Sequence, residues 1–191
     1  SAIATSAVSA SSNVMEVLST SDFAIDRPIE FSGTLFGGVI AGTTYFIKSI
    51  INMQRVLITG SSGFLGSNLI PNLSKKYIIE KFNRNESNKF NADVIIHLAG
   101  KAHDLKQSSL SDEYYKSNTD LTKKIFDKFL KSSSKIFIFM SSVKAVRDNY
   151  DNVLDENVIA SPTTDYGKSK LMAEQYILSK ELPLHKKVFI L

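Results

Sequence analysis

Short apolar runs and amphipathic stretches alternate along the chain from residue 56 onward. The first run, Val56, Leu57 and Ile58, is typical of a strand in a sheet that is covered on both faces. The alternation predicts strands over residues 56–58, 77–82, 93–100, 135–140 and 186–191, and helices over residues 64–76, 111–131 and 165–181. This order predicts an α/β fold with a doubly wound parallel sheet of the Rossmann type.

The first 52 residues lack this α/β character, so the predicted domain boundary falls at 52/53. Residues 1–22 are rich in Ser and Ala and are interpreted as a flexible extension. Residues 31–47 carry no charge and hold glycine pairs at the spacing of packed membrane helices, so residues 31–51 could form a membrane helix. Because Gly, Ser and Thr dilute its hydrophobicity, a pair of strands or unrelated upstream sequence is favoured over membrane contact.

Composition narrows the function classes without selecting one. The 191 residues carry a formal charge of +4 from lysines spread along the chain, with no arginine-rich stripe, so no nucleic-acid partner is expected. The absence of cysteine excludes disulfides and thiolate chemistry and agrees with a reducing compartment, so we expect a cytoplasmic protein. No metal site is predicted.

Three glycines spaced three apart lie between the first strand and the first helix. Gly60 can adopt the positive φ of a tight turn, Gly63 lets the backbone approach a ligand, and Gly66 lets the helix pack closely on the strand. The N–H groups of the first helical turn favour a pyrophosphate, which predicts a dinucleotide site. The turn lacks the Gly-Lys-Ser/Thr ending of a P-loop, which counts against a nucleoside triphosphatase, and an ordinary structural turn is the alternative.

The end of the second strand bears on the choice of dinucleotide. An acidic residue there binds the free ribose 2′-OH of NAD, whereas an arginine accommodates the 2′-phosphate of NADP. The chain has Asn83 and Arg84 at this position, and Glu80 lies within the strand. Arg84 favours NADP slightly, but a solvated loop arginine is an equal alternative, so NAD and NADP both stay open.

Tyr166 and Lys170 are four residues apart in the helix predicted over residues 165–181 and therefore share one face. An ammonium beside a phenol lowers the pKa of the phenol toward the range of a general acid/base. Ser142 follows a predicted parallel strand, at the sheet edge where such folds bind ligands. The same Tyr–Lys spacing also arises by chance on helices. Here, however, the glycine turn, the strand that leads to Ser142 and this helix follow one another along the chain in one consistent order.

Five motifs occur in order, TGSSGFLG, HLAG, Asn118-x-x-x-Thr122, MSSVKAV and YGKSK. Together they resemble the extended short-chain dehydrogenase/reductase family of nucleotide-sugar epimerases and dehydratases over residues 53–191. SSVKAV and HLAGKAHD are most similar to bacterial enzymes that epimerise or reduce UDP-linked amino sugars for surface polysaccharides. The resemblance implies an NAD(P)-dependent enzyme with a UDP-linked nucleotide-sugar substrate, and it allows a homodimer through the helix of Tyr166.

The resemblance also implies residue roles. Tyr166 is the acid/base, Lys170 lowers its pKa and binds the nicotinamide ribose, and Ser142 bonds the sugar oxygen. Asn118 steadies the active-site backbone or a phosphate. The implied cofactor-binding residues are Gly60, Gly63, Phe64, Leu65, Gly66, Arg84, Leu98, Ala99, Gly100, Tyr166 and Lys170, and the implied substrate-binding residues are Ser142, Val143 and Asn118.

Departures from the family pattern limit the reaction. Val143 and Lys144 replace the Asp-Glu pair of the 4,6-dehydratases, so a C4 epimerase or 4-ketoreductase is expected rather than a dehydratase. Asp165 stands where the family usually has proline, and the short stretch before residue 93 predicts that the family's third strand is reduced or lost. The family continues into a sugar-binding lobe after the strand that ends at Leu191, so we expect a fragment. The alternative is a non-catalytic NAD(P)-binding fragment or sensor module.

Overall fold

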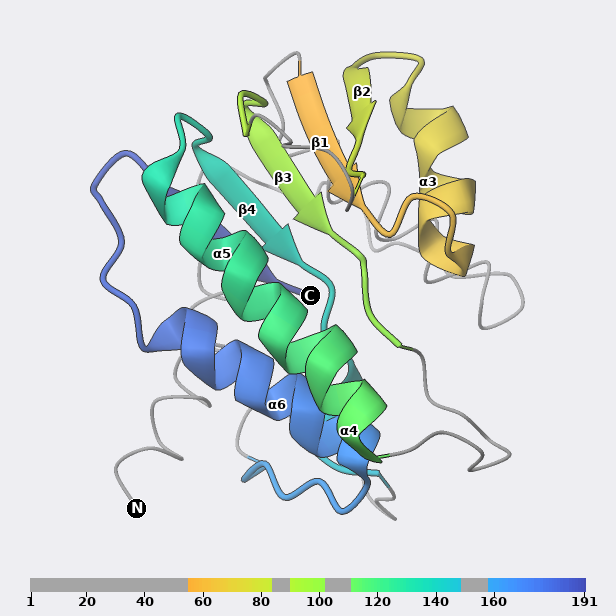
Figure 1. The fold of residues 1–191 in the computed structure, drawn as a ribbon, viewed down its shortest axis with the longest axis vertical. Coiled ribbons are helices and arrows are strands. Elements are labelled where there is room, and N and C mark those ends of the chain that lie inside the picture. Colours follow the sequence, from red (N-terminus) through yellow and green to blue (C-terminus); the bar gives the residue numbers. More distant parts are fainter. Residues whose placement is uncertain (1–54, 84–89, 102–110, 149–157) are drawn as a thin grey trace, which may run out of the picture.

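The computed structural model describes residues 55–83, 90–101, 111–148 and 158–191. In this part of the chain, five parallel strands form one sheet in the order β2-β1-β3-β4-β5 (Figure 1). The strands are β1 (Arg55–Thr59), β2 (Ile78–Lys81), β3 (Val94–His97), β4 (Ile136–Phe139) and β5 (Lys187–Ile190). The helices are α3 (Phe64–Leu73), α4 (Ser111–Tyr114), the π-helix η1 (Tyr115–Asp120), α5 (Leu121–Lys131), the 3₁₀ turn η2 (Val143–Ala145) and α6 (Asp165–Leu178). The predicted α/β fold with a parallel sheet is confirmed.

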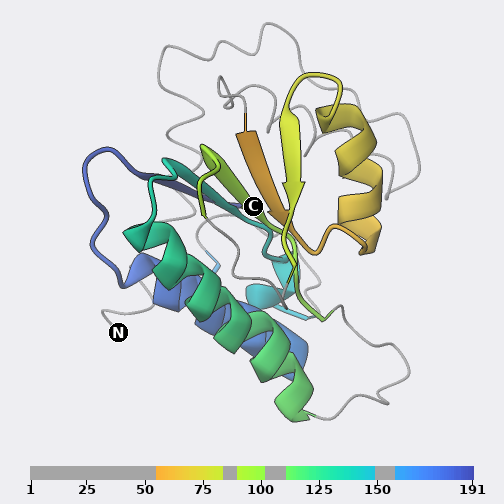
Figure 2. The same cartoon turned by 45° about the horizontal axis from the view of Figure 1, so that its top comes forward.

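Alternate residues of each strand point to opposite sides of the sheet, and on both sides they are apolar. Helices therefore cover both faces. Val56 and Ile58 of β1 lie in a core that also contains Leu69 and Leu73 of α3. Leu57 points the other way, into a phenylalanine-rich core to which α5 and α6 contribute. Figures 1 and 2 show α5 and α6 side by side on the face opposite α3.

The strand order places a topological switch between β1 and β3. The chain passes from β1 through α3 to β2 on one side, and then returns to pair β3 with the other side of β1. Thr59 pairs with His97, and His97 pairs with Phe139, so β1, β3 and β4 end at the same level. Open parallel sheets bind ligands at the carboxyl ends of strands beside such a switch, so this edge is where a site is expected.

The observed elements differ from the predicted ones mainly at their ends. α3 ends at Leu73 rather than at residue 76, because the N–H of Ser74 closes the last turn on Ile70 and Tyr77 then bonds back to Leu73. The helix predicted over residues 111–131 is continuous but contains the π-helical segment η1. Within the described ranges, β2 is the outer strand on its side of the sheet.

The predicted N-terminal extension and the candidate membrane helix at residues 31–51 lie outside the described residues. Among the helices that are described, none combines the length and the apolar character needed to cross a bilayer.

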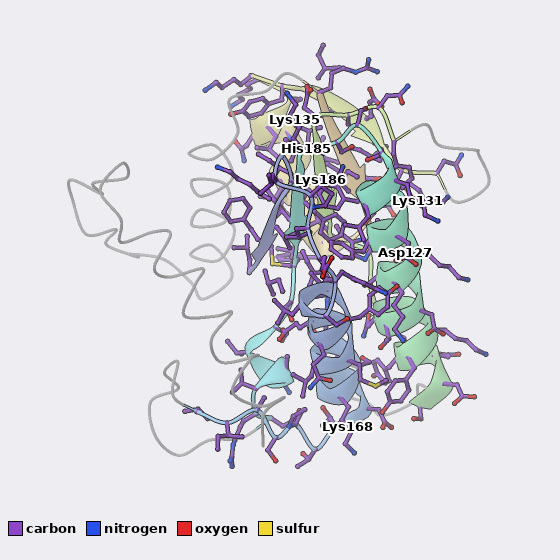
Figure 3. The ribbon with its side chains drawn as sticks, turned by 90° about the vertical axis from the view of Figure 1, so that its left-hand side faces the viewer. Asp127, Lys131, Lys135, Lys168, His185 and Lys186 are labelled. Atoms are coloured by element: carbon purple, nitrogen blue, oxygen red, sulfur yellow. The ribbon has the colours of Figure 1, made fainter. Side chains whose placement is uncertain are left out.

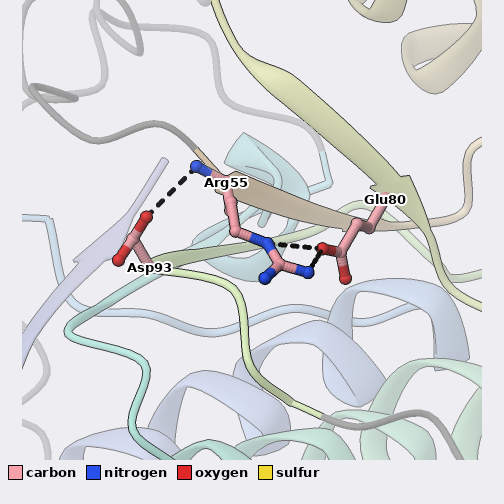
Figure 4. Close-up of polar contacts among 3 residues, drawn as sticks. All are labelled: Arg55, Glu80 and Asp93. Carbon is pink, nitrogen blue, oxygen red and sulfur yellow. Dashed lines mark hydrogen bonds and ion pairs between the residues drawn. The ribbon is translucent and has the colours of Figure 1, made fainter.

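Polar contacts of Arg55, the first residue of β1, join this strand to β2 and to the residue before β3. The guanidinium of Arg55 binds the carboxylate of Glu80, with Nε 2.9 Å from Oε1, and the backbone N–H of Arg55 donates to Asp93 Oδ2 at 3.1 Å (Figure 4). The backbone N–H of Asp93 donates to the Arg55 carbonyl at 3.0 Å. Glu80, considered above for cofactor selection, therefore contacts Arg55 in this structure.

A buried lysine holds the C-terminal end of α5 against the chain that enters β5 (Figure 3). Lys186 is 6% exposed, and its Nζ donates to the carbonyl oxygens of Phe129, Ser132 and Ser134 at 3.0, 2.8 and 2.6 Å. The ammonium also lies 4.5 Å from the centroid of the Phe129 ring. A cation at a helix C-terminus satisfies carbonyls that the helix itself leaves unpaired. Burial lowers the pKa of Lys186 from its usual value.

We expect Lys186→Met to lower the free energy of unfolding by about 2–4 kcal/mol, because it removes three buried hydrogen bonds while keeping most of the apolar stem. Urea denaturation followed by circular dichroism measures the change. Lys187→Met is the matched control, since Lys187 is exposed and loses the same charge. Equal losses in the two variants would show that charge, rather than the three hydrogen bonds, sets the effect.

Candidate active site

The turn after β1 and the first turn of α3 leave no room for side chains at Gly60 and Gly66. Gly60 has a φ of +69°, and a Cβ there would lie 2.6 Å from the backbone nitrogen of Ala99. A Cβ on Gly66 would lie 2.7 Å from Ser61 Cα. The N–H of Gly63 donates to the carbonyl of Gly60 at 3.0 Å and closes the turn. The geometry thus requires glycine at positions 60 and 66, and it sets this turn against the segment that follows β3.

The N-terminus of α3 points past the carboxyl end of β1. Gly63 is the N-cap of this ten-residue helix and supplies no side chain to cap it. Phe64 is largely exposed at the start of the helix, Leu65 is half-buried, and Gly66 is buried. First-turn N–H groups that have no capping side chain are suited to an anion. The cradle formed by the glycine turn, residues 60–63, and the first turn of α3 therefore fits a dinucleotide pyrophosphate.

A chain of hydrogen bonds runs beneath this edge from β3 to η1. The N–H of Ala99 donates to Thr59 Oγ1 at 3.1 Å, and Thr59 Oγ1 lies 2.6 Å from His97 Nδ1. His97 Nε2 lies 2.9 Å from Thr122 Oγ1, which donates to the carbonyl of Asn118 at 2.5 Å. Because each hydroxyl has one proton to donate, this chain assigns the Nε2–H tautomer to His97.

The imidazole of His97 is uncharged in this network. His97 is fully buried, and burial together with the positive charge of Lys170 lowers the pKa of the imidazole to about 3. The ring stacks on Phe139 of β4 at a centroid distance of 5.7 Å. A neutral histidine with both ring nitrogens bonded is a fixed support at neutral pH rather than a proton carrier.

Asn118 fixes the backbone just after Gly100. Its Oδ1 accepts the N–H of Lys101 at 2.7 Å, and its Nδ2 donates to the Lys101 carbonyl at 3.2 Å and to Ser169 Oγ at 3.0 Å. A Cβ on Gly100 would lie 2.7 Å from Asn118 Oδ1 and 3.7 Å from Lys170 Nζ. Of the two roles predicted for Asn118, these contacts favour support of the backbone.

The π-helical turn η1 presents Asn118 and its neighbour to α6. Thr119 Oγ1 donates to the carbonyl of Ser169 at 2.8 Å, and both Asn118 and Thr119 are buried. A π turn adds one residue to a helical turn and is often found at functional sites. Here it places two consecutive side chains on the same partner residue.

Lys170 lies at the carboxyl end of β4. It is 6% exposed, its Nζ donates to the carbonyl of Met140 at 2.7 Å, and the ammonium lies 4.8 Å from the centroid of the Phe139 ring. Burial lowers the pKa of Lys170 to about 8, although the carboxylate of Glu174 opposes this shift. Tyr166, one turn earlier on α6, is half-buried with its ring 6.1 Å from and edge-on to that of Tyr114.

Ser142 begins the turn that packs against the start of α6. Its Oγ accepts the N–H of Lys144 at 3.3 Å and caps η2, and a hydroxyl that accepts one bond can still donate another. Val143 is 72% exposed beside it. A Cβ on Gly167 would lie 2.8 Å from Pro162 Cβ, which shows how closely the chain before α6 packs on its first turn.

The structure therefore brings together most of the predicted site residues. The glycine turn contacts Ala99, Gly100 lies between Asn118 and Lys170, and Lys170 contacts the residue two before Ser142. Leu98 is half-buried at the end of β3. Arg84 lies outside the described residues, so its role stays a prediction. No group of three or more metal-ligating side chains occurs among the residues that are described.

Sequence reasoning missed several supporting residues. Thr59 and His97 directly precede the glycine turn and the Leu98–Gly100 segment, so their places in the motifs could have indicated them. Glu174 lies four residues after Lys170, on the same helical face. Asp148 and Ser169 carried no local signal, because their partners are distant in the sequence.

Asp148 fixes the start of α6. Its carboxylate accepts the N–H groups of Thr163 and Thr164 at 2.6 and 2.9 Å, and both threonine hydroxyls at 2.9 and 2.5 Å. Thr164 is itself the N-cap of α6 and accepts the N–H of Gly167 at 3.1 Å. Burial alone would raise the pKa of Asp148, but these four hydrogen bonds outweigh it and hold the pKa well below its usual value.

We expect Asp148→Asn to lower the free energy of unfolding at pH 7 by about 1–2 kcal/mol, because a neutral amide replaces a partly exposed carboxylate with four donors. The folded-state pKa is lowered, so the contribution of Asp148 is complete above about pH 4 and decreases as the pH falls from there. Urea denaturation between pH 3 and pH 7 should thus show the difference between variant and wild type shrinking in acid.

Asp120→Asn, at an exposed aspartate of η1, is the control for the loss of one carboxylate. If the free energies of unfolding of Asp148→Asn and wild type differ by the same amount at pH 7 and pH 3, the predicted ionisation of Asp148 is contradicted.

The chain matches a family model and several known proteins. The family model described as "NAD dependent epimerase/dehydratase family" matches residues 80–181. The UDP-glucose 4-epimerase of Vibrio cholerae is 30% identical over 158 residues, which is 66% of this chain and 47% of that protein. The decarboxylating sterol-4-alpha-carboxylate 3-dehydrogenase of Dictyostelium discoideum is 29% identical over 162 residues, 68% of this chain and 49% of that protein.

Among solved structures, MoeE5 in complex with UDP-glucuronic acid and NAD superposes with a TM-score of 0.61 at 21% identity, over 71% of this chain and 52% of that one. At this identity the likeness shows the fold. The chain spans about half the length of the curated relatives it matches.

Proposed function

The chain belongs to the NAD-dependent epimerase/dehydratase family, and from this premise we propose that the protein is an NAD(P)-dependent nucleotide-sugar epimerase or 4-ketoreductase that acts at a sugar C4. One observation carries the proposal. The glycine turn, the Leu98–Gly100 segment, Lys170 and the chain leading to Ser142 converge at the carboxyl edge of β1, β3 and β4. The nucleotide-sugar activity of the Vibrio cholerae relative supports the substrate class.

The proposed cofactor fits the residues that surround this edge. The first turn of α3 would hold the pyrophosphate, since Gly63 leaves it without a capping side chain. Gly100, which has no side chain toward Lys170, would admit the nicotinamide riboside, and the Lys170 ammonium would bind its ribose. When bound, the cofactor accepts a hydride from the sugar carbon and can return it.

The chain's own residues would move and hold the proton. The Tyr166 phenolate would take the proton of the C4 hydroxyl, and Lys170, one turn later on the same helix, would stabilise the phenolate charge. Ser142 would donate a hydrogen bond to the same sugar oxygen as it becomes a carbonyl. In an epimerase the keto sugar is then reduced on its other face, whereas a ketoreductase begins from the keto sugar.

The end of β2 supports a slight preference for NADP. Residues 81–84 contain no acidic side chain, and the Glu80 carboxylate contacts Arg55. A UDP-linked amino sugar, a role in surface polysaccharide synthesis, a homodimer and a cytoplasmic location remain predictions from the sequence. The second candidate function is NAD(P) binding without catalysis, which the same cradle supports.

Cofactor binding tests the common basis of both candidates. We expect the chain to bind one of the pairs NAD/NADH and NADP/NADPH in calorimetric titration. Gly66→Ala should weaken that binding at least tenfold, which is about 1.4 kcal/mol, because the new Cβ separates α3 from the turn. Ser74→Ala, at the other end of α3, is the control. Unchanged affinity in Gly66→Ala would refute the placement of the pyrophosphate.

Turnover distinguishes the two candidates. With UDP-glucose or UDP-N-acetylglucosamine as substrate of the full-length protein, we expect Tyr166→Phe to lower kcat by about 10²–10⁴-fold, the usual contribution of a general acid/base. Product is measured by chromatography of the nucleotide-sugars. Turnover in Tyr166→Phe equal to wild type would refute the acid/base role. Cofactor binding with no turnover of any nucleotide-sugar, even by a protein that also carries the family's sugar-binding lobe, would favour the non-catalytic candidate.

A further inference from the structure

A carboxylate lies behind Lys170, on the side of α6 that faces the end of β4. Glu174 is one helical turn after Lys170, and its Oε1 accepts a short hydrogen bond from the hydroxyl of Ser141. The backbone N–H of Ser141 donates to the carbonyl of Leu191 at 2.6 Å. Ser141 thus joins the ends of β4 and β5 to α6, directly before Ser142.

Lys170 and Ser141 belong to the same short stretch of structure. Lys170 Nζ donates to the carbonyl of Met140, the residue before Ser141, at 2.7 Å. Lys170 and Glu174 therefore hold adjacent residues of the segment that leads from β4 to Ser142. One does so through a backbone carbonyl and the other through a side-chain hydroxyl.

The two charged groups also influence each other. Burial raises the pKa of Glu174 to about 7, and the Ser141 hydrogen bond and the Lys170 charge oppose this rise. Burial lowers the pKa of Lys170 to about 8, and the Glu174 charge opposes that fall. Each group thereby favours the charged form of the other, which keeps the ammonium populated near neutral pH.

We propose that Glu174 is a positioning residue, which acts through Lys170 and Ser141 to keep the Lys170 ammonium charged and to hold Ser142 in place. This inference rests on the proposed function, since it gives Glu174 control over the pH range in which Lys170 can bind the cofactor ribose and support Tyr166. Glu174 itself needs no contact with cofactor or substrate.

Several other charged groups lie near α6, and most of them have partners of their own. From β3, His97 faces Lys170, but burial and the Lys170 charge lower its pKa to about 3, so it stays neutral from pH 6 to pH 9. From η1, Tyr115 donates to Asp165 at 3.2 Å, and from α5, Asp127 accepts the hydroxyl of Tyr176 at 2.7 Å. From α4, Glu113 pairs with Lys101, and η2 contributes Lys144.

The test measures Lys170 directly, without catalysis. The side-chain resonance of Lys170 in the isotope-labelled chain, assigned with Lys170→Met, is titrated from pH 6 to pH 10, and NADH or NADPH affinity is measured over the same range. We expect Glu174→Gln to lower the pKa of Lys170 by about one unit, because an amide accepts the Ser141 bond but carries no charge. The pH at which cofactor affinity falls by half should move down by a similar amount.

Three variants separate charge from packing. Ser141→Ala removes the hydrogen bond and keeps the carboxylate, so Lys170 should titrate near its wild-type value. Glu174→Asp keeps the negative charge and should lower the pKa of Lys170 less than Glu174→Gln does. Glu181→Gln removes an exposed carboxylate three residues beyond α6 and should change nothing.

The outcomes distinguish this inference from the proposed function. An unchanged Lys170 pKa in folded Glu174→Gln, or equal shifts in Glu174→Gln and Glu174→Asp, would overturn the role of Glu174 even if the wild-type chain binds cofactor. The wild-type chain could bind none of the four dinucleotides while Glu174→Gln still lowers the pKa of Lys170. In that case the proposed function fails, and with it the role of Glu174 in cofactor binding.

Discussion

The candidate site depends on a close approach between two backbones. A Cβ on Gly60 would lie 2.6–2.8 Å from backbone atoms of Leu98 and Ala99, so the turn after β1 and the segment after β3 touch without side chains between them. This contact closes the switch point of the sheet and leaves the first turn of α3 facing the segment that ends at Gly100. From there the Asn118 amide and the Lys170 ammonium continue the edge toward β4. A side chain at Gly60 would separate the two halves of the cradle.

Buried polar groups secure what the glycines bring together. The chain from Ala99 through Thr59, His97 and Thr122 to Asn118 satisfies every ring nitrogen and hydroxyl that it includes. An unpaired polar group in this interior would cost about 1–3 kcal/mol, so the chain has few alternative arrangements. The histidine is neutral, whereas burial lowers the pKa of Lys170 nearby and the charge of Glu174 opposes that fall. The site thus combines a fixed neutral support with one ionisable pair.

The sequence predicted the parts of this structure that follow from local pattern. The apolar runs indicated all five strands, and the glycine spacing indicated the turn, because both depend on neighbouring residues. The π-helical turn at Asn118 was not predicted, since hydrophobic periodicity does not show where a helix gains one residue. Asp148 and Lys186 were not predicted as supports because their partners are 15–16 and 52–57 residues away. Tyr166, Lys170 and Ser142 were proposed from helix spacing, strand position and motif order, whereas their neighbours Glu174 and Ser141 were not proposed.

Strand register explains why Glu80 is poorly placed to select a cofactor. The Arg55–Glu80 ion pair is partly exposed, and such pairs contribute only about 0–1 kcal/mol, so this contact alone would not prevent Glu80 from turning to a ligand. Glu80, however, pairs with Leu57, two residues before β1 ends at Thr59. The N–H of Phe82 is the group that bonds to Ile58, next to the glycine turn. By this register Glu80 lies below the strand ends, whereas Asn83 lies beyond the last residue of β2.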